Sequence, residues 1–180
     1  NMERWRWMPR DLGPRHVIVN VPAFTAAIVQ DGRVVRRHRA VVGARRTPTP
    51  QLSAQITAVT LNPWWTVPQS IIREMGGRFG AGYHVTRGEN GRLSVRQEPG
   101  PRNALGRIKI EMPNEHAIFL HDTPARNLFG NANRALSHGC VRVEQPTTLA
   151  RYLLRDKPEW DNDRIDAAMH AGKEQHVKLT

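Results

Sequence analysis

The strongest constraint on the fold is a stretch near the N-terminus whose side chains follow a period of two. Three segments show this pattern, which is typical of half-buried β-strands: His16–Val21, Phe24–Gln30 and Arg33–Val42. The last two are joined by Asp31-Gly32, a dipeptide that favours a tight hairpin. Antiparallel strands need only short connections, whereas parallel strands need long crossovers. The pattern therefore predicts an antiparallel meander.

The rest of the chain continues with short strand patterns and adds helical patterns mainly near its C-terminus. Pro146 stands in the first turn of one helical segment, where helices tolerate it, and Leu149, Tyr152 and Leu153 form the apolar stripe of that segment. The early strands lack crossover helices and no Gly-rich phosphate loop is visible. The sequence thus predicts a mostly β protein, a β-sandwich or closed sheet with a few short helices, in preference to a Rossmann fold. The predicted strands are 55–61, 93–97, 107–112, 117–121 and 175–179, and the predicted helices are 69–75, 146–155 and 161–170.

The length of 180 residues favours one domain with a small appendage. Residues 1–14 are predicted to form an N-terminal arm or helix end, and residues 15–180 the main domain. Within it, 67–103 contains many Gly, Arg and Pro residues and is predicted as a lid or loop region. No apolar run is long enough to span a membrane, and the start lacks the pattern of a signal peptide. An export signal is therefore expected upstream of this sequence.

The chain is strongly basic. Its 27 Lys and Arg residues outnumber 16 Asp and Glu residues, which gives a formal net charge of +11. Such a surface attracts polyanions such as nucleic acid, anionic lipid or acidic wall polymers, but an Arg-rich solvated surface without such a partner fits equally well. The basic residues are scattered and no nucleic-acid-binding motif is present, so we expect no nucleic-acid partner.

The only cysteine, Cys140, has no disulfide partner within the chain. It ends the string Ser137-His138-Gly139-Cys140, and it follows His121 by nineteen residues. A free thiol has a pKa of about 8.5 and needs a base to become a nucleophilic thiolate, a task that a neutral imidazole can perform. His121 ends an apolar strand, and a base delivered from another strand can approach the sulfur head-on. We therefore predict Cys140 as nucleophile and His121 as its base.

Residues next to this pair have predicted roles of their own. His138 is a competing base, because it would share a face with Cys140 if their string were extended. Gly139 lets the backbone approach a substrate closely, and its N–H and that of Cys140 are candidate donors to an oxyanion. Asp122 is expected to orient His121 through its backbone carbonyl rather than its carboxylate, because adjacent side chains on an extended chain diverge.

Three other interpretations of these residues compete with the catalytic one. Histidines and a cysteine can be packed without any chemistry, but a glycine between two reactive residue types in a loop packs poorly. A zinc site formed by His121, His138, Cys140 and Asp122 lacks the usual paired spacing. A tyrosine-phosphatase loop would need Arg six residues after the cysteine, where this chain has Pro146. We therefore expect no metal and no cofactor.

At these residues the sequence resembles the YkuD-type L,D-transpeptidases. Their pattern is a His, then after an interval Ser/Thr-His-Gly-Cys, followed by an apolar residue and Arg or Asn. Here it reads His121, then Ser137-His138-Gly139-Cys140-Val141-Arg142. Other segments resemble the large periplasmic Gram-negative subgroup, so the resemblance spans nearly the whole chain, although 67–98 is shorter than the lid of larger relatives. These segments are 2–7, 42–43, 47–50, 62–64, 99–106 and 120–124.

The resemblance implies a periplasmic enzyme that acts on peptidoglycan stem peptides as donor and acceptor. Cys140 would attack the L–D bond of a tetrapeptide stem, form a thioester, and transfer the acyl group to the diaminopimelate amine of a second stem, giving a 3→3 crosslink. The backbone from Ser137 to Cys140 would hold the oxyanion, and carbapenems would acylate the same cysteine. Two alternatives stay open: hydrolysis at the same site, by an L,D-carboxypeptidase or a peptidoglycan–protein amidase, and a non-catalytic wall-binding module.

Several further side chains are candidates for contacts with the stem peptides. Phe119 precedes His121 by two residues and so shares its strand face. Arginines can hold carboxylates by paired hydrogen bonds, and aromatic side chains can line a cleft. For each there is a structural alternative, namely a solvated surface arginine or a packed aromatic ring. The candidates are Arg142, Arg134, Arg126, Phe119, Trp64, Trp65 and Tyr83.

Overall fold

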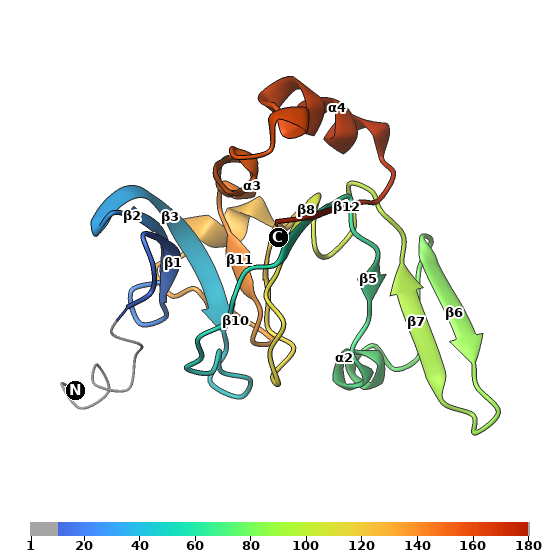
Figure 1. Ribbon diagram of the computed structural model, residues 1–180. Coiled ribbons are helices and arrows are strands. Elements are labelled where there is room, and N and C mark those ends of the chain that lie inside the picture. The colour runs from blue at the N-terminus through green and yellow to red at the C-terminus, as the bar shows by residue number, and fades with distance from the viewer. Residues whose placement is uncertain (1–10, 180) are drawn as a thin grey trace.

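The computed structural model describes residues 11–179, so the arm predicted for residues 1–14 lies for the most part outside the described residues. Strands dominate the described chain, and its helices are short (Figure 1). The strands are β1 (Arg15–Asn20), β2 (Thr25–Gln30), β3 (Arg33–Gly43), β4 (Ala58–Leu61), β5 (Trp65–Thr66), β6 (Tyr83–Arg87), β7 (Leu93–Gln97), β8 (Ile108–Glu111), β9 (Leu120–His121), β10 (Ala135–Ser137), β11 (Val141–Val143) and β12 (Gln175–Lys178). The helices are α2 (Gln69–Glu74), α3 (Pro146–Leu154) and α4 (Asn162–Ala171), with 3-10 turns η1 (Arg126–Gly130) and η2 (Pro158–Trp160).

The larger of two sheets contains nine strands in the order β1-β2-β3-β11-β9-β8-β4-β12, with β10 paired to β3. Its first three strands are the predicted antiparallel meander. Asp31 and Gly32 have φ angles of 50° and 72°, and positive φ at both positions is the signature of a type I′ hairpin turn. In contrast, β11 runs parallel to β9 and antiparallel to β3. Segments far apart in the sequence thus meet at the centre of this sheet.

The two faces of its central strands differ in chemistry. Successive residues of a strand point to opposite faces, so each row of cross-strand partners lies on one face. One row is apolar and belongs to the buried core: Val177, Val59, Ile110, Leu120 and Val141. The adjacent row points to the other face and is polar: His176, Thr60, Lys109, His121 and Arg142.

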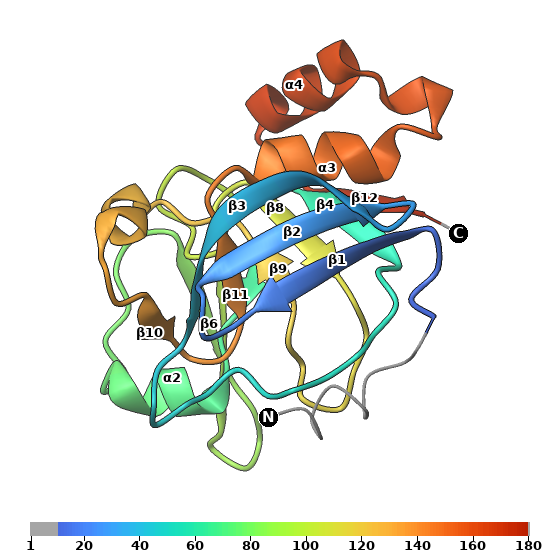
Figure 2. The ribbon, with the colours of Figure 1, turned by 90° about the vertical axis from the view of Figure 1, so that its left-hand side faces the viewer.

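Helices α3 and α4 cover the apolar face. Leu149 and Leu154 of α3 and Ile165 of α4 are fully buried and join the core cluster, and the two helices lie together on one side of the sheet (Figure 2). Asp161 caps α4 by accepting a 2.7 Å hydrogen bond from the backbone N–H of Arg164. Both predicted helices are confirmed. No helix among residues 11–179 is long and apolar enough to cross a membrane.

The second sheet lies largely within 67–103. The predicted helix 69–75 is present as α2 and the predicted strand 93–97 as β7, and β6 completes a three-stranded antiparallel sheet in the order β5-β7-β6. Val67, Ile72 and Val95 are buried between this sheet and α2. Strand β6 has no counterpart among the predicted strands, because none of its residues is a buried apolar side chain that would show a period of two. Whether the unit moves as a lid stays a prediction.

Two strands of the larger sheet are shorter than predicted. The strand expected at 55–61 begins at Ala58, and the one expected at 117–121 contains only Leu120 and His121. Before Leu120, Asn114 holds the chain in a turn, since its side-chain oxygen accepts from the N–H of His116 and of Ile118. Side-chain hydrogen bonds of this kind compete with the pairing of a strand.

Candidate active site

The predicted base lies on strand β9, and the predicted nucleophile lies just before β11, the parallel neighbour of β9. His121 ends β9 and pairs with Arg142 of β11, while Cys140 stands one residue before β11 begins. The N–H of Val141 donates to the carbonyl of Phe119 at 3.1 Å, which fixes this register. With strands about 4.8 Å apart and a rise of about 3.3 Å per residue, the Cα atoms of Cys140 and His121 are about 8 Å apart. Side chains can meet across that separation when they share a face of the sheet.

The tight loop before Cys140 is held by Ser137. Its hydroxyl donates to the carbonyl of Cys140 at 2.6 Å and accepts from the N–H of Gly139 at 3.1 Å. Gly139 has a φ of +116°, a backbone conformation that residues with a side chain rarely adopt. A Cβ there would stand 3.1 Å from Cδ1 of Ile118. Ser137 and Gly139 therefore determine the shape of the nucleophile loop.

The loop 43–50 holds the nucleophile loop from outside. Thr47 donates through Oγ1 to the carbonyl of Ser137 at 3.0 Å, and Thr49 donates through Oγ1 to the carbonyl of Gly139 at 2.7 Å. The hydroxyl of Thr49 also accepts from the N–H of Gly43 at 2.9 Å. The sequence indicated these threonines only as part of the family resemblance, and no local signal pointed to their contacts.

His121 is buried, with 4% of its surface exposed, and has a defined tautomer. Its Nδ1 lies 2.5 Å from the carbonyl oxygen of Asp122, which can only accept a hydrogen bond. Nδ1 therefore carries the proton, and Nε2 is the basic atom. The contact is to the backbone carbonyl of Asp122 and not to its carboxylate, the arrangement expected from the sequence.

The environment of His121 keeps its ring neutral. Burial is the largest cause that lowers the pKa of His121, to about 3, and the charge of Arg142 acts in the same direction. The backbone carbonyls of Asp122 and Leu105 oppose this shift, and the charge of Lys109 adds to it. At neutral pH the ring thus has a free lone pair and can accept a proton.

The carboxylate of Asp122 has a structural task. It accepts from the N–H of Arg107 at 2.8 Å and from the N–H of Thr123 at 2.6 Å, and it forms an ion pair with Arg126. Gly106 lies against it so closely that a Cβ on this residue would overlap the carboxylate. The sequence-based expectation that Arg126 holds a substrate carboxylate has no support in these contacts, because Asp122 already binds it.

The thiol of Cys140 is partly exposed and neutral at rest. Burial raises the pKa of Cys140, while the backbone of Phe119 and the charges of Lys109 and Arg142 act to lower it. Its Sγ lies 3.8 Å from the carbonyl of Ala117. A thiolate therefore does not preexist and has to form as the proton moves to a base.

His138, the competing base, is directed elsewhere. Its Nε2 lies 2.8 Å from Oε2 of Glu74, the last residue of α2. This contact joins the nucleophile loop to the smaller sheet unit. Since a carboxylate can accept, Nε2 of His138 acts as a donor here, and the ring is engaged with α2.

Gly139 is a weaker oxyanion donor than expected, because its N–H is already bonded to Ser137. The N–H of Cys140 has no acceptor among the residues that the structure describes. A backbone N–H at the nucleophile itself is well placed to bind the oxygen of a tetrahedral intermediate.

The remaining predicted contacts divide into two groups. Phe119 lies beside the site, with its ring centroid 5.5 Å from that of His121. Trp64 and Tyr83 belong to the smaller unit: Trp64 contacts His84 edge to face, and Tyr83 packs on the core of that sheet. No contact within the described part of the chain brings these two aromatic side chains to Cys140.

Arg134 is engaged in the fold. Its guanidinium donates to the carbonyls of Ala40, Asn131 and Phe24, at 3.2, 2.8 and 3.3 Å. These bonds hold the segment around β10 against β3. Substrate binding by Arg134, expected from the sequence, gains no support from this arrangement.

A polar link joins the smaller sheet to the site. The side-chain amide of Asn103, 1% exposed, donates to the carbonyls of Pro63 and Glu98, and its Oδ1 accepts from the N–H of Leu105. The backbone carbonyl of Leu105 in turn raises the pKa of His121. The sequence offered only the resemblance of 99–106 as a signal for this role.

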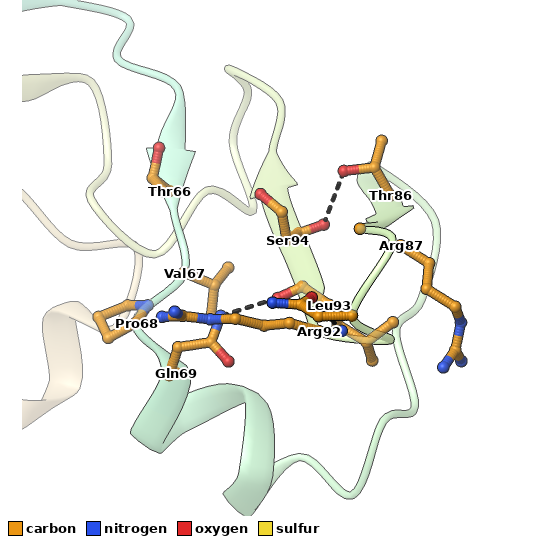
Figure 3. Close-up of a pocket in the computed structure, with 11 residues that line it drawn as sticks. Thr66, Val67, Pro68, Gln69, Thr86, Arg87, Arg92, Leu93 and Ser94 are labelled. Carbon is orange, nitrogen blue, oxygen red and sulfur yellow. Dashed lines mark hydrogen bonds between the residues drawn. The ribbon is translucent and has the colours of Figure 1, made fainter.

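One cavity, of about 600 Å³, lies in the smaller unit between α2 and the β6–β7 hairpin (Figure 3). It includes none of the residues around Cys140. Within residues 11–179, no three His, Cys, Asp or Glu side chains gather in a way that could hold a metal ion. The cavity is lined by Thr66, Val67, Pro68, Gln69, Thr86, Arg87, Gly88, Asn90, Arg92, Leu93 and Ser94.

Comparison with known proteins gives a consistent set of relatives. The YkuD family, described as the L,D-transpeptidase catalytic domain, matches residues 14–161. A curated protein of Haemophilus influenzae named "Putative L,D-transpeptidase" is 31% identical over 182 residues, which cover 87% of this chain. The match covers 37% of that relative, so this chain spans well under half its length.

Solved structures with weaker likeness were also found. An L,D-transpeptidase from Mycobacterium smegmatis is 16% identical with a TM-score of 0.39, and the match covers 77% of this chain and 53% of that one. The catalytic domain of an Enterococcus faecium L,D-transpeptidase acylated by ertapenem is 11% identical with a TM-score of 0.36, covering 94% and 99%.

Proposed function

Since this chain belongs to the YkuD family of L,D-transpeptidase catalytic domains, we propose that it is a peptidoglycan L,D-transpeptidase with Cys140 as its nucleophile. The observation that carries the proposal is the pairing of β9 with β11. This pairing supports the proposal because the partly exposed lone thiol directly precedes β11, beside the strand that ends in His121, a neutral imidazole whose Nε2 is the basic atom. Acyl transfer by a cysteine needs this combination of groups.

In the first half-reaction, the Sγ proton of Cys140 passes to Nε2 of His121 as the sulfur attacks the carbonyl carbon of the L–D bond in a tetrapeptide stem. The N–H of Cys140 binds the oxyanion. The C–N bond then breaks, and the imidazolium returns its proton to the amine of the departing D-alanine. The product is a thioester on Cys140.

In the second half-reaction, the side-chain amine of diaminopimelate on another stem attacks the thioester. His121 takes the proton of that amine and passes it to the departing thiolate, and a 3→3 crosslink results. Water in place of the amine would give hydrolysis, as in a carboxypeptidase or an amidase. Carbapenems, which are bound or joined to two of the related enzymes, would acylate the same thiol. With such a substrate, we expect the enzyme to act outside the cytoplasm, in the periplasm.

Incubation with disaccharide tetrapeptides, followed by mass spectrometry, tests the proposal. We expect crosslinked dimers together with free D-alanine from the wild type and neither product from Cys140→Ala. Tripeptide without dimers would identify a hydrolase. Turnover by Cys140→Ala equal to that of the wild type would reject the cysteine mechanism. A non-catalytic wall-binding module would leave the tetrapeptides unchanged in both samples.

A further inference from the structure

We propose that Lys109 and Arg142 together form a binding site for a carboxylate of the donor stem peptide. The inference deepens the proposed function and rests on it. It assigns Lys109, a residue for which the sequence suggested no role, to substrate selection. The chemical class of donor that such a site selects is a peptide with a free carboxylate close to the bond that Cys140 attacks.

The sheet register places the two cations on either side of the base. Lys109 of β8 and Arg142 of β11 are the direct cross-strand partners of His121 in β9. Direct partners point to the same face, and adjacent strands lie about 4.8 Å apart, so the Cα atoms of Lys109 and Arg142 are about 10 Å apart. Both side chains are long enough to reach a group bound above His121.

Arg142 is a partly buried cation that has no acidic partner among residues 11–179. Neither a hydrogen bond nor an ion pair from its guanidinium to any described residue is present, and its Nε is buried without an acceptor. Arg39 and Arg151, in contrast, bind Glu144 and Asp166. A guanidinium removed from water without a partner is costly, and this cost falls when a carboxylate binds it by two hydrogen bonds.

Lys109 is held in position, but its ammonium group still has N–H donors without a partner. Its Nζ lies 3.3 Å from Oε1 of Glu111 and 4.9 Å from the ring centroid of Phe119. The same Oε1 accepts a 2.8 Å hydrogen bond from the hydroxyl of Thr60, so Glu111 is shared between two donors. An ammonium group has three N–H donors, and one contact leaves donors for a ligand. Glu111 and Phe119 therefore orient Lys109 across the face that carries His121.

The charge balance at the site favours an anion. The charges of Lys109 and Arg142 lower the pKa of His121 and the pKa of Cys140. The acid next to His121 in the sequence, Asp122, has its carboxylate bound to Arg126. Glu111 balances the charge of Lys109, so a carboxylate of the substrate would supply the one negative charge that Arg142 lacks. Two sources are chemically equivalent here: the terminal carboxylate of D-alanine and the side-chain carboxylate of diaminopimelate.

The test compares three tetrapeptide donors with the wild type, using the rate of Cys140 acylation at saturating and limiting donor. One donor is unmodified, one has a carboxamide in place of the terminal carboxylate, and one has a carboxamide at diaminopimelate. Loss of one charge-assisted hydrogen bond corresponds to about a 10- to 100-fold effect. We expect one of the two amides to lower kcat/KM by this factor, mainly through KM, and thereby to identify the carboxylate that is bound.

Lys109→Met removes the charge while keeping the length of the side chain. We expect Lys109→Met to lower kcat/KM for the unmodified donor by about tenfold or more. For the amide donor that the wild type uses poorly, kcat/KM should remain almost unchanged. Lys109→Arg keeps the positive charge and should restore the difference in kcat/KM between these two donors. Lys178→Met removes an exposed lysine from edge strand β12 and serves as the matched control with wild-type selectivity.

Equal kcat/KM values for all three donors with the wild type would overturn the inference without the need for any variant. An equal loss for all donors in Lys109→Met would overturn it too, since that result indicates a structural role. If the wild type forms no acyl-enzyme with any donor, the proposed function itself fails. That outcome differs from an enzyme that is active but does not discriminate among the donors.

Discussion

Gly106 shows how strongly one residue can control the site. It has a φ of +62°, and a Cβ on it would overlap the carboxylate of Asp122, whose own carbonyl holds His121. Gly106→Ala combines backbone strain with a clash that only movement of Asp122 can relieve. We expect the free energy of unfolding to fall by about 2 to 4 kcal/mol and acylation of Cys140 to slow. Urea denaturation and an acylation assay measure these two effects.

Gly76 offers a matched control, because it has nearly the same φ, +60°, but a Cβ on it would meet no other atom within 4 Å, so a substitution there adds only strain. Gly76→Ala should cost about 1 kcal/mol and leave acylation unchanged. Equal losses of stability for the two variants would show that the contact with Asp122 is unimportant.

His38 is a second residue with a measurable effect, this time on acid stability. It is 3% exposed, and neither Nδ1 nor Nε2 has a hydrogen-bond partner among the described residues. Burial, followed by the charge of Arg36, lowers the pKa of His38 in the folded state, and Glu144 partly opposes this. An unfolded histidine has a pKa of about 6.5, so below that pH the unfolded state binds more protons and stability decreases.

Replacing His38 by leucine removes this proton linkage. We expect His38→Leu to be at least as stable as the wild type at pH 7.5 and to gain on it by about 1 kcal/mol at pH 5. Urea titrations at both pH values measure the difference. If the difference between variant and wild type is the same at both pH values, His38 does not titrate as proposed.

At the scale of elements, the loop 43–50 supports the nucleophile loop without touching the reacting atoms. Thr49 is its centre, since its hydroxyl joins Gly43 to Gly139. Thr49→Val keeps the size of the side chain and removes both hydrogen bonds. We expect kcat to fall about tenfold with a small change in KM. The substitution disturbs the position of the sulfur, whereas the contacts of the substrate stay the same.

Thr86→Val is the corresponding control for this loop. Thr86 is an exposed residue of β6 whose hydroxyl lies 3.4 Å from the carbonyl of Ser94, outside the site. Its kinetics should match those of the wild type. A wild-type kcat for Thr49→Val would mean that the loop 43–50 does not position Cys140.

At the scale of the whole molecule, local patterns predicted what local forces determine. The hairpin at Asp31-Gly32 depends on the backbone preferences of these two residues, which can be recognised from the sequence alone. The parallel pairing of β9 with β11 depends on contacts between segments far apart in the sequence, and no local pattern predicts it.

The same distinction explains the site. Cys140 and His121 were predicted because each lies in a readable local context and because the motif is specific to a family. The flanking position of Lys109 was not predicted, since it follows from the register of β8 against β9. Strand β7 was predicted, but its partner β6 was missed because it has no buried apolar residue that would show a period of two.

The most direct test of the central claim is the intact mass of the protein after exposure to a carbapenem, for the wild type, Cys140→Ala and His121→Gln. The account predicts that the wild type gains the mass of one carbapenem, that Cys140→Ala gains none, and that His121→Gln gains it at least about 100-fold more slowly. Adduct formation by Cys140→Ala, or a wild-type rate for His121→Gln, would contradict the assignment of nucleophile and base.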